Sequence, residues 1–253
     1  MITFKRIVCF ASVASLLFFL SACETTPTVH RPGETPQIHK RVALLEIEEP
    51  MVYDIRIMQS MMPDSPGLTL PGRVVGLGMV TMMKTLDQGQ RNRALTKALD
   101  FWKFKISEHL TDDITRELEK IGYEVVVVKP EYRRRARFVD KYPKAPKPVD
   151  AYVDLVVQFA GYVAGKPDLP FVPTVEVPFK VVSSWNNEVI HQGTLIYGGP
   201  VPVTGPTDMP ADPQHNVRGF DNLCATDCEV SPAVKGLTAA SEGIAKLLSQ
   251  HIR

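Results

Sequence analysis

The sequence has almost no excess charge of either sign. Its 253 residues carry 29 Lys and Arg against 28 Asp and Glu, which gives a formal net charge of +1 at pH 7. A broad nucleic-acid-binding surface needs a clear positive excess, so this class is not expected. Hydrophobic residues make up 44% and charged residues 23% of the chain, values typical of a folded soluble domain. This balance excludes a disordered charged tail and a polytopic membrane protein.

The chain also lacks the short motifs that mark common catalytic and cofactor sites. Neither Gly-x-Ser-x-Gly nor His-Glu-x-x-His occurs, and no phosphate-binding glycine loop is present. We therefore expect neither an enzyme nor a bound cofactor or metal. Five residues late in the chain could offer ligands to calcium, but their spacing matches no calcium loop and a solvated loop is expected: Asp208, Asp212, His215, Asp221 and Asp227.

No apolar run is long enough to cross a membrane as a stable helix. The run from Ile7 to Leu20 has 14 residues, whereas a spanning helix needs about 20. It follows Lys5 and Arg6, and therefore predicts a signal peptide. The sequence Leu-Ser-Ala-Cys that ends at Cys23 resembles the bacterial lipobox, which implies cleavage before this cysteine and its acylation. The alternative is an ordinary secretory signal with a chance cysteine.

These features divide the chain into three parts. Residues 1–22 are expected to be a lipoprotein signal peptide and residues 23–40 a polar, flexible tether. Residues 41–253 are expected to form a single periplasmic α/β domain. In proteobacterial lipoproteins an aspartate after the lipidated cysteine favours the inner membrane, and here that residue is Glu24. The resemblance thus implies attachment to the outer membrane through N-terminal acyl chains such as palmitate, facing the periplasm.

Cysteine is scarce, with four residues in the whole chain. Cys9 leaves with the signal peptide and Cys23 carries the lipid, so Cys224 and Cys228 remain. An even number of cysteines in an oxidising compartment predicts a disulfide between them. A redox-active pair would favour the tighter Cys-x-x-Cys spacing. A zinc site would need two further ligands.

Hydrophobic periodicity predicts five strands and two long helices. The first strand, RVALLEI, is apolar on both faces and is therefore expected to lie centrally. The order β-α-β-β-β-β-α favours an α/β (α+β) fold, in which a mixed five-stranded sheet carries long amphipathic helices on one face. The strands are expected at 41–47, 123–129, 151–164, 174–184 and 189–197, and the helices at 95–121 and 234–253.

Single residues refine this expectation. Gly122 is expected to end the first helix in the left-handed conformation. Pro178 is expected to mark a sheet edge or a bulge, because proline donates no backbone hydrogen bond. The sequence Trp185-Asn-Asn-Glu188 is typical of a hairpin turn.

Several of these segments resemble a known group of envelope proteins. The sequences Val-Ala-Leu-Leu, Gly-Tyr-Glu-Val-Val-Val, Tyr-Val-Asp-Leu-Val-Val and Asn-Asn-Glu-Val follow one another in this order. Together with the lipobox and the closing helix they resemble the periplasmic α/β domain of curli-secretion CsgG lipoproteins and the N-terminal domain of TolB. The resemblance covers roughly residues 40–48 and 95–253. It implies an assembly or interaction module rather than an enzyme, and pore-forming strands are not expected.

A segment at about 48–93 holds seven of the nine methionines and is expected to be an insertion in the domain. Its two clusters share the spacing i, i+3, i+4, which places three thioethers on one helical face. Such clusters suit Cu(I), an adaptable partner-binding surface, or plain core packing. The clustered residues are Met58, Met61, Met62, Met79, Met82 and Met83.

One marked charge run follows the second predicted strand. A solvated face is the usual reason for such a run, although arginines also suit lipopolysaccharide phosphates or an acidic partner. The run consists of Arg133, Arg134, Arg135, Arg137, Lys141, Lys144 and Lys147.

The sequence thus predicts an outer-membrane-anchored periplasmic lipoprotein that contacts other envelope proteins in an assembly, secretion or transport complex. Its expected partners are the membrane and those proteins, and no nucleic acid. The alternative is a periplasmic ligand- or copper-binding lipoprotein that uses the methionine clusters.

Overall fold

The computed structural model describes residues 41–58, 73–134, 136–199, 205–225 and 231–252, and for residues 73–86 it describes the backbone alone. The strands are β1 Arg41–Leu45, β2 Asp54–Ile57, β3 Glu124–Val128, β4 Ala151–Leu155, β5 Phe159–Ala164, β6 Val172–Ser183, β7 Val189–Tyr197 and β8 Asp208–Met209. The helices are α2 Arg73–Phe101, α3 Ile106–Lys120, α4 Phe220–Leu223 and α5 Pro232–His251, with a short 3-10 turn, η2, at Pro213–His215.

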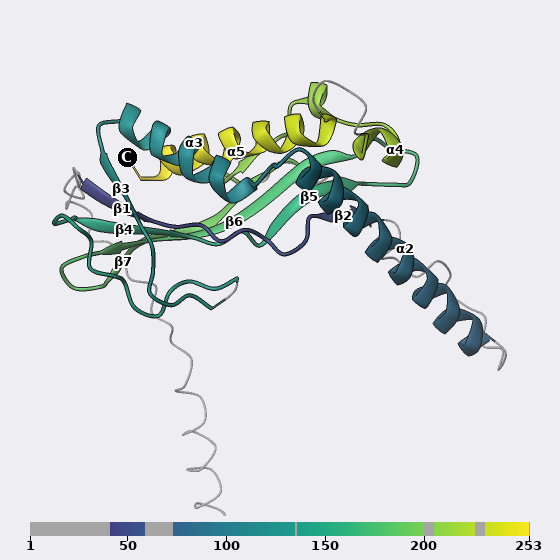
Figure 1. Cartoon of the computed structure of the whole chain (residues 1–253), viewed down its shortest axis with the longest axis horizontal. Helices are drawn as coiled ribbons and strands as arrows, with labels where there is room; N and C mark the ends of the chain where they lie inside the picture. Colours follow the sequence, from purple (N-terminus) through teal and green to yellow (C-terminus); the bar gives the residue numbers. More distant parts are fainter. Residues whose placement is uncertain (1–40, 59–72, 135, 200–204, 226–230, 253) are drawn as a thin grey trace, which may run out of the picture. The chain divides into compact units, whose positions relative to one another are not determined.

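The strands form one mixed sheet (Figure 1). Its order is β2-β5-β6-β4-β1-β3, and β7 and β8 continue it beyond β6. Strand β1 is parallel to both β3 and β4, and β2 is parallel to β5. Strand β6 is antiparallel to β4, β5 and β7. The predicted α+β class with a mixed sheet is confirmed. The predicted number of strands is wrong, because the described part of the chain contributes eight rather than five.

One reason for the difference is that the strand predicted at 151–164 is two strands. Val156 and Gln158 donate their N–H groups to the carbonyl oxygens of Pro178 and Glu176, both at 3.0 Å. Residues 156–158 therefore lie opposite only two residues of β6, Val177 and Pro178. Pro178 has no backbone N–H and cannot donate a hydrogen bond to the neighbouring strand. This irregularity separates β4 from β5, and it is the bulge that Pro178 was expected to mark.

The helix predicted at 95–121 is likewise two helices. Helix α2 ends in a Schellman motif, in which Phe104 N–H bonds to Leu99 O at 3.0 Å and Lys103 N–H to Asp100 O at 2.9 Å. Lys103 takes the left-handed conformation at φ 52°. The residue in that position is lysine rather than glycine, so no typical turn residue marks the end of α2 in the sequence. The apolar stripe also continues past the break, and the two helices therefore look like one. Gly122, at φ 97°, ends α3 as predicted.

The two faces of the sheet are covered differently. Val42 and Leu44 of β1 pack in the larger core, beneath α3 and α5, which lie side by side on one face (Figure 1). Ala43 and Leu45 point to the other face, where a smaller core includes Val139 and Val149 from the loop after β3. The first strand is therefore central and buried on both faces, as its sequence predicts.

Part of the methionine-rich segment belongs to the fold. Strand β2, which lies in the segment, pairs with β5. Helix α2 begins in the segment and, just beyond it, buries Leu95 and Leu99 in the larger core. The segment between Ile57 and Arg73 lies outside the described residues, apart from Met58.

Candidate functional site

A cleft opens where the chain leaves the sheet between β1 and β2. Residues 46–53 lie between the carboxyl end of β1 and the start of β2, near the interruption between β4 and β5. The cleft has a volume of about 940 Å³ and lies between the carboxyl ends of β1 and β3 and the first turns of α3. A smaller cavity of about 260 Å³ adjoins it and shares Glu48, Glu49 and Arg133. The crevice outside the carboxyl ends of parallel strands is the usual position of a binding site in such sheets.

Glu49 and Tyr53 hold the cleft segment against the start of α3. Ser107 N–H donates to Glu49 Oε2 and Ile106 N–H donates to Tyr53 Oη, both at 2.9 Å. The Tyr53 hydroxyl also donates to Glu49 Oε1. Burial and the nearby Glu49 carboxylate raise the pKa of Tyr53, so its hydroxyl stays protonated. The two amides at this helix start, which would otherwise suit an anion, are thus occupied by the Tyr53 hydroxyl and the Glu49 carboxylate.

A buried ion pair borders the cleft through Arg133, which lines it. Arg133 Nη2 lies 2.5 Å from Asp154 Oδ1, and the two side chains are 3% and 0% exposed. Arg133 also donates to Leu155 O at 2.8 Å, and Val139 N–H donates to Asp154 Oδ2 at 2.9 Å. Burial raises the pKa of Asp154, whereas the Arg133 charge opposes that rise. Arg133 Nε is buried and has no hydrogen-bond partner among the described residues.

The charges around the cleft do not balance. Two of its three basic side chains are paired within it, Lys105 with Glu108 at 2.6 Å and Lys129 with Glu46 at 3.7 Å. The third, Arg133, is neutralised by Asp154. Glu48 and Asp112 are exposed and form no ion pair with any residue that the structure describes. The cleft therefore presents an excess of negative charge to solvent.

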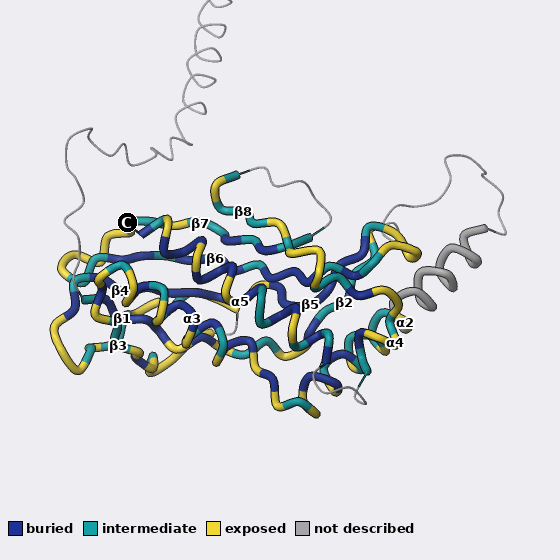
Figure 2. Tube along the Cα trace, turned by 90° about the horizontal axis from the view of Figure 1, so that it is seen from above, coloured by how far each residue is buried: buried dark blue, intermediate teal, exposed yellow. Residues whose placement is uncertain are grey.

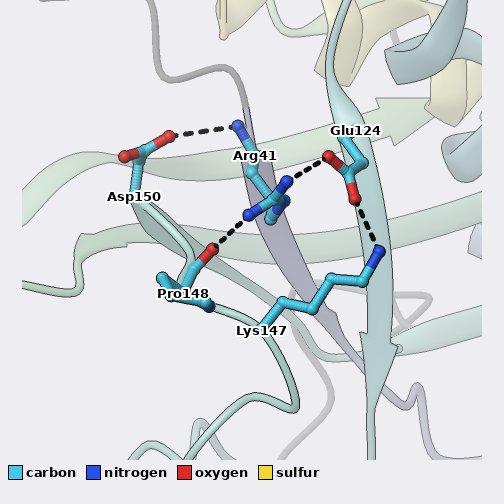
Figure 3. Close-up of polar contacts among 5 residues, drawn as sticks. All are labelled: Arg41, Glu124, Lys147, Pro148 and Asp150. Atoms are coloured by element: carbon cyan, nitrogen blue, oxygen red, sulfur yellow. Dashed lines mark hydrogen bonds and ion pairs between the residues drawn. The ribbon is translucent and has the colours of Figure 1, made fainter.

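A second polar network lies at the opposite end of β1 (Figure 3). Arg41 donates to Glu124 Oε2 at 2.6 Å and to Pro148 O at 3.1 Å. Lys147 donates to Glu124 Oε1 at 3.2 Å, and the Arg41 N–H donates to Asp150 Oδ2 at 3.1 Å. The Arg41 and Lys147 hydrogen bonds lower the pKa of Glu124. This network joins the start of β1 to β3 and to the loop that covers the smaller core.

The predicted basic run is therefore divided. Arg133 is buried in the ion pair, and Lys147 pairs with Glu124. Arg135 lies outside the described residues. The other members are exposed, as a solvated face requires: Arg134, Arg137, Lys141 and Lys144.

The predicted cysteine sites are described in part. Cys23 and Cys228 lie outside the described residues. Cys224 follows α4, is half-buried, and has its thiol pKa raised to about 11, chiefly by burial. Lipidation and the disulfide both stay predictions.

The methionine clusters are described only in part as well. Met58 directly follows β2 and is 42% exposed. Met61 and Met62 lie outside the described residues, and only the backbone is described for Met79, Met82 and Met83 in α2. The choice between copper, partner and core therefore stays open.

The proposed calcium ligands are not gathered within the described residues. No three His, Cys, Asp or Glu side chains there lie close enough to hold a metal ion. Asp208 accepts from Gly205 N–H at 3.1 Å, and Asp212 accepts from Gln214 N–H at 3.0 Å. Asp221 lies in α4, and Asp227 is outside the described part of the chain.

Of the residues that line the cleft, the sequence interpretation named Arg133 alone, as a member of the basic run. A signal was nevertheless present, because the run Glu46-Ile-Glu-Glu49 directly follows the first buried strand. Asp112 belongs to the polar face of α3, and sequence alone does not indicate that this face borders a cleft.

No protein-family model matches the chain, and no curated protein matches it as a relative. Among solved structures it is similar to a DUF330 protein from Xanthomonas campestris, with 14% identity and a TM-score of 0.37 over 88% of this chain and 94% of that one. It is also similar to a PelC dodecamer from Paraburkholderia phytofirmans, with 13% identity and a TM-score of 0.31 over 83% and 84%. Within the described residues, no helix combines the length and hydropathy that a membrane crossing requires.

Proposed function

We propose that this chain is an outer-membrane-anchored periplasmic lipoprotein that binds other envelope proteins in an assembly, secretion or transport complex. The lipobox-like sequence at Cys23 and the polar segment that follows it support the anchor. The predicted resemblance to the CsgG and TolB domains supports the role as an interaction module.

The cleft between β1, β3 and α3 is the observation that supports binding. Its lining offers the carboxylates of Glu48 and Asp112, which form no ion pair among the described residues, while the lining residue Arg133 is held by its buried pair with Asp154. A segment with Lys or Arg side chains complements this surface, and complementary charge favours both orientation and rate of association. The proposed occupant is therefore a basic segment of another envelope protein.

A non-enzymatic role is part of this proposal. The tyrosines with the most strongly raised pKa values hold the scaffold together: Tyr53 at the start of α3, and Tyr162, whose hydroxyl donates to Ala233 O at 3.1 Å. In the described part of the chain, the cleft shows no hydroxyl or thiol nucleophile hydrogen-bonded to a histidine base, which is one common arrangement for nucleophilic catalysis.

Charge reversal tests the cleft. In intact cells, Glu48→Lys with Asp112→Lys should lower the yield of the cross-linked envelope complex about tenfold or more, because two attractive pairs become repulsive. A matched control reverses Glu131 and Asp140, which are equally exposed but do not line the cleft. Both double variants should melt like the parent chain. Equal yields from the two variants, or a complex that neither changes, would sink the proposal.

A further inference from the structure

The outer edges of the sheet are not protected equally. The edge of β2 is covered by side chains of α2, since Ile55 N–H bonds to Asn92 Oδ1 at 2.9 Å and Tyr53 N–H to Thr96 Oγ1 at 3.1 Å. The edge of β7 is covered at its C-terminal end by β8. Strand β3 lies at the margin of the sheet and, within the described part of the chain, pairs with β1 alone (Figure 2).

The hydrogen bonds of β3 show which of its residues face outward. Val128 O accepts from Glu46 N–H at 2.9 Å, on the side of β1. Because successive residues of a strand point their backbone groups to opposite sides, Val126 and Glu124 also bond toward β1. The N–H and C=O groups of Val125 and Val127 therefore point away from the sheet. No described residue bonds to them.

Beyond Glu124, the strand has none of the residues that usually prevent strand pairing. Residues 125–128 are four valines, without a charge, a proline, a glycine or a bulge. Val127 is 48% exposed. Unpaired backbone groups in an apolar, β-branched strand are a template for another strand.

We propose that β3 pairs antiparallel with β3 of a second copy of this chain, so that the two sheets join across a two-fold axis at Val126. The outward residues must face each other in such a pair, which places Val125 opposite Val127 of the second copy. Val126 then faces Val126, and every opposed pair within residues 125–127 is valine against valine.

The charges at the ends of β3 agree with this register. Glu124 lies opposite Val128 of the second copy, so the two Glu124 carboxylates are four positions apart, or about 13 Å. Each keeps its own partners, Arg41 and Lys147. The pairing thus brings no like charges together and leaves no charge without its partner.

The dimer is expected to be weak, and this determines how it is best detected. Two five-residue strands bury less than the 1,200–2,000 Å² or so of a standard stable interface. Covalent trapping in the native envelope is therefore the suitable measurement. A facing pair that is not hydrogen-bonded has Cα atoms about 4.5 Å apart, which a disulfide can span.

The test compares Val126→Cys with Val127→Cys in the full-length chain, oxidised in intact cells and resolved on non-reducing gels. Val127 is well exposed whereas Val126 is half-buried, so random collision would favour cross-linking at 127. The two-fold register predicts the opposite, because Val127 lies diagonally from its own copy at about 7–8 Å. We expect a disulfide-linked dimer for Val126→Cys about tenfold above Val127→Cys and above the parent chain, whose own cysteines set the background.

A second measurement does not depend on cysteine. Native mass spectrometry of the full chain in detergent should show about tenfold less dimer for Val127→Lys, because a charge on the edge blocks strand pairing. Val189→Lys is the control, since Val189 is 47% exposed on β7, away from this edge. The proposal is overturned if Val127→Cys cross-links as well as Val126→Cys, if neither cross-links, or if the cross-linked partner is a different protein.

Discussion

At the residue scale, the fold depends on polar groups at the two ends of β1. At its carboxyl end Glu49 and Tyr53 bind the first amides of α3, and at its amino end Arg41 joins Glu124, Pro148 and Asp150. The first set fixes the wall of the cleft and the second fixes the loop over the smaller core. Both act between segments that are far apart in sequence.

The Arg41 network makes a prediction about pH. The pKa of Glu124 is lowered in the folded chain, first by Arg41 and then by Lys147. Because the folded value lies below the ordinary value of about 4.3, the stabilisation is present above that value and is lost as pH falls through the folded pKa. Lys147→Met should therefore raise the pKa of Glu124, and Arg41→Met should raise it further. NMR titration of the Glu124 carboxyl group measures this.

Lys144→Met is the control for that titration, because Lys144 is an exposed lysine of the same loop and, among the described residues, forms no hydrogen bond with Glu124. A Glu124 titration that is the same in Lys147→Met and in Lys144→Met would contradict the assignment of the shift to these hydrogen bonds.

Some residue roles could be predicted from sequence and others could not. The left-handed Gly122 was predicted because glycine after an apolar helical stripe has one common use. The burial of Arg133 was not, because its partner Asp154 is 21 residues away and lies among the apolar residues of β4. A run of basic residues suggests exposure to solvent, and only the fold shows which of its side chains is buried.

At the element scale, α5 approaches the sheet through glycine. A methyl group on Gly236 would overlap the hydroxyl of Tyr162 on β5 and lie 3.2 Å from Pro173 Cβ. Tyr162 is fully buried and bonded to the carbonyl oxygens of Pro232 and Ala233, so it cannot move aside easily. The close contact of helix and sheet at this point depends on the absence of a side chain.

Two glycine substitutions should therefore have opposite effects. Gly236→Ala should lower the free energy of unfolding by about 1–3 kcal/mol, because it overpacks the core. Gly89→Ala in α2 should raise it by about 0.5–1 kcal/mol, because its new methyl group has no neighbour closer than 3.9 Å and alanine favours the helix. Urea unfolding of both variants measures the difference. Destabilisation of equal size at both sites would contradict this account.

The prediction of elements succeeded where packing is regular. The β-branched runs and their alternation located β3 and the β6–β7 hairpin, and the helical spacing of apolar residues located most of the buried faces of α3 and α5. It failed at the two interruptions, because the break at Lys103 uses a residue without a turn signature. The break at 156–158 depends on Pro178 in a neighbouring strand. Strand β2 was missed because four residues among methionines carry too short a pattern.

At the scale of the whole molecule, the proposed anchor precedes the described domain in the sequence. Cys23→Ser should abolish acylation and release a soluble periplasmic protein, because the proposed attachment depends on acyl chains alone. Fractionation after a salt wash, with the parent chain beside it, measures this. The released variant should melt like the parent domain, since the described core begins at Arg41. A variant that stays with membranes would show that lipid on Cys23 is not the anchor.

The position of β1 has a mechanical consequence. The chain enters the described domain at Arg41, which begins a central strand flanked by β3 and β4 in parallel register. A force that pulls this end along the strand axis loads the β1–β3 and β1–β4 ladders in shear. The hydrogen bonds of both ladders must then break together rather than one after another. The Arg41 bonds to Glu124, Pro148 and Asp150 lie nearest the pulled end and would bear the force first. Tension arriving through the N-terminal segment would thus meet the sheet along its most resistant direction.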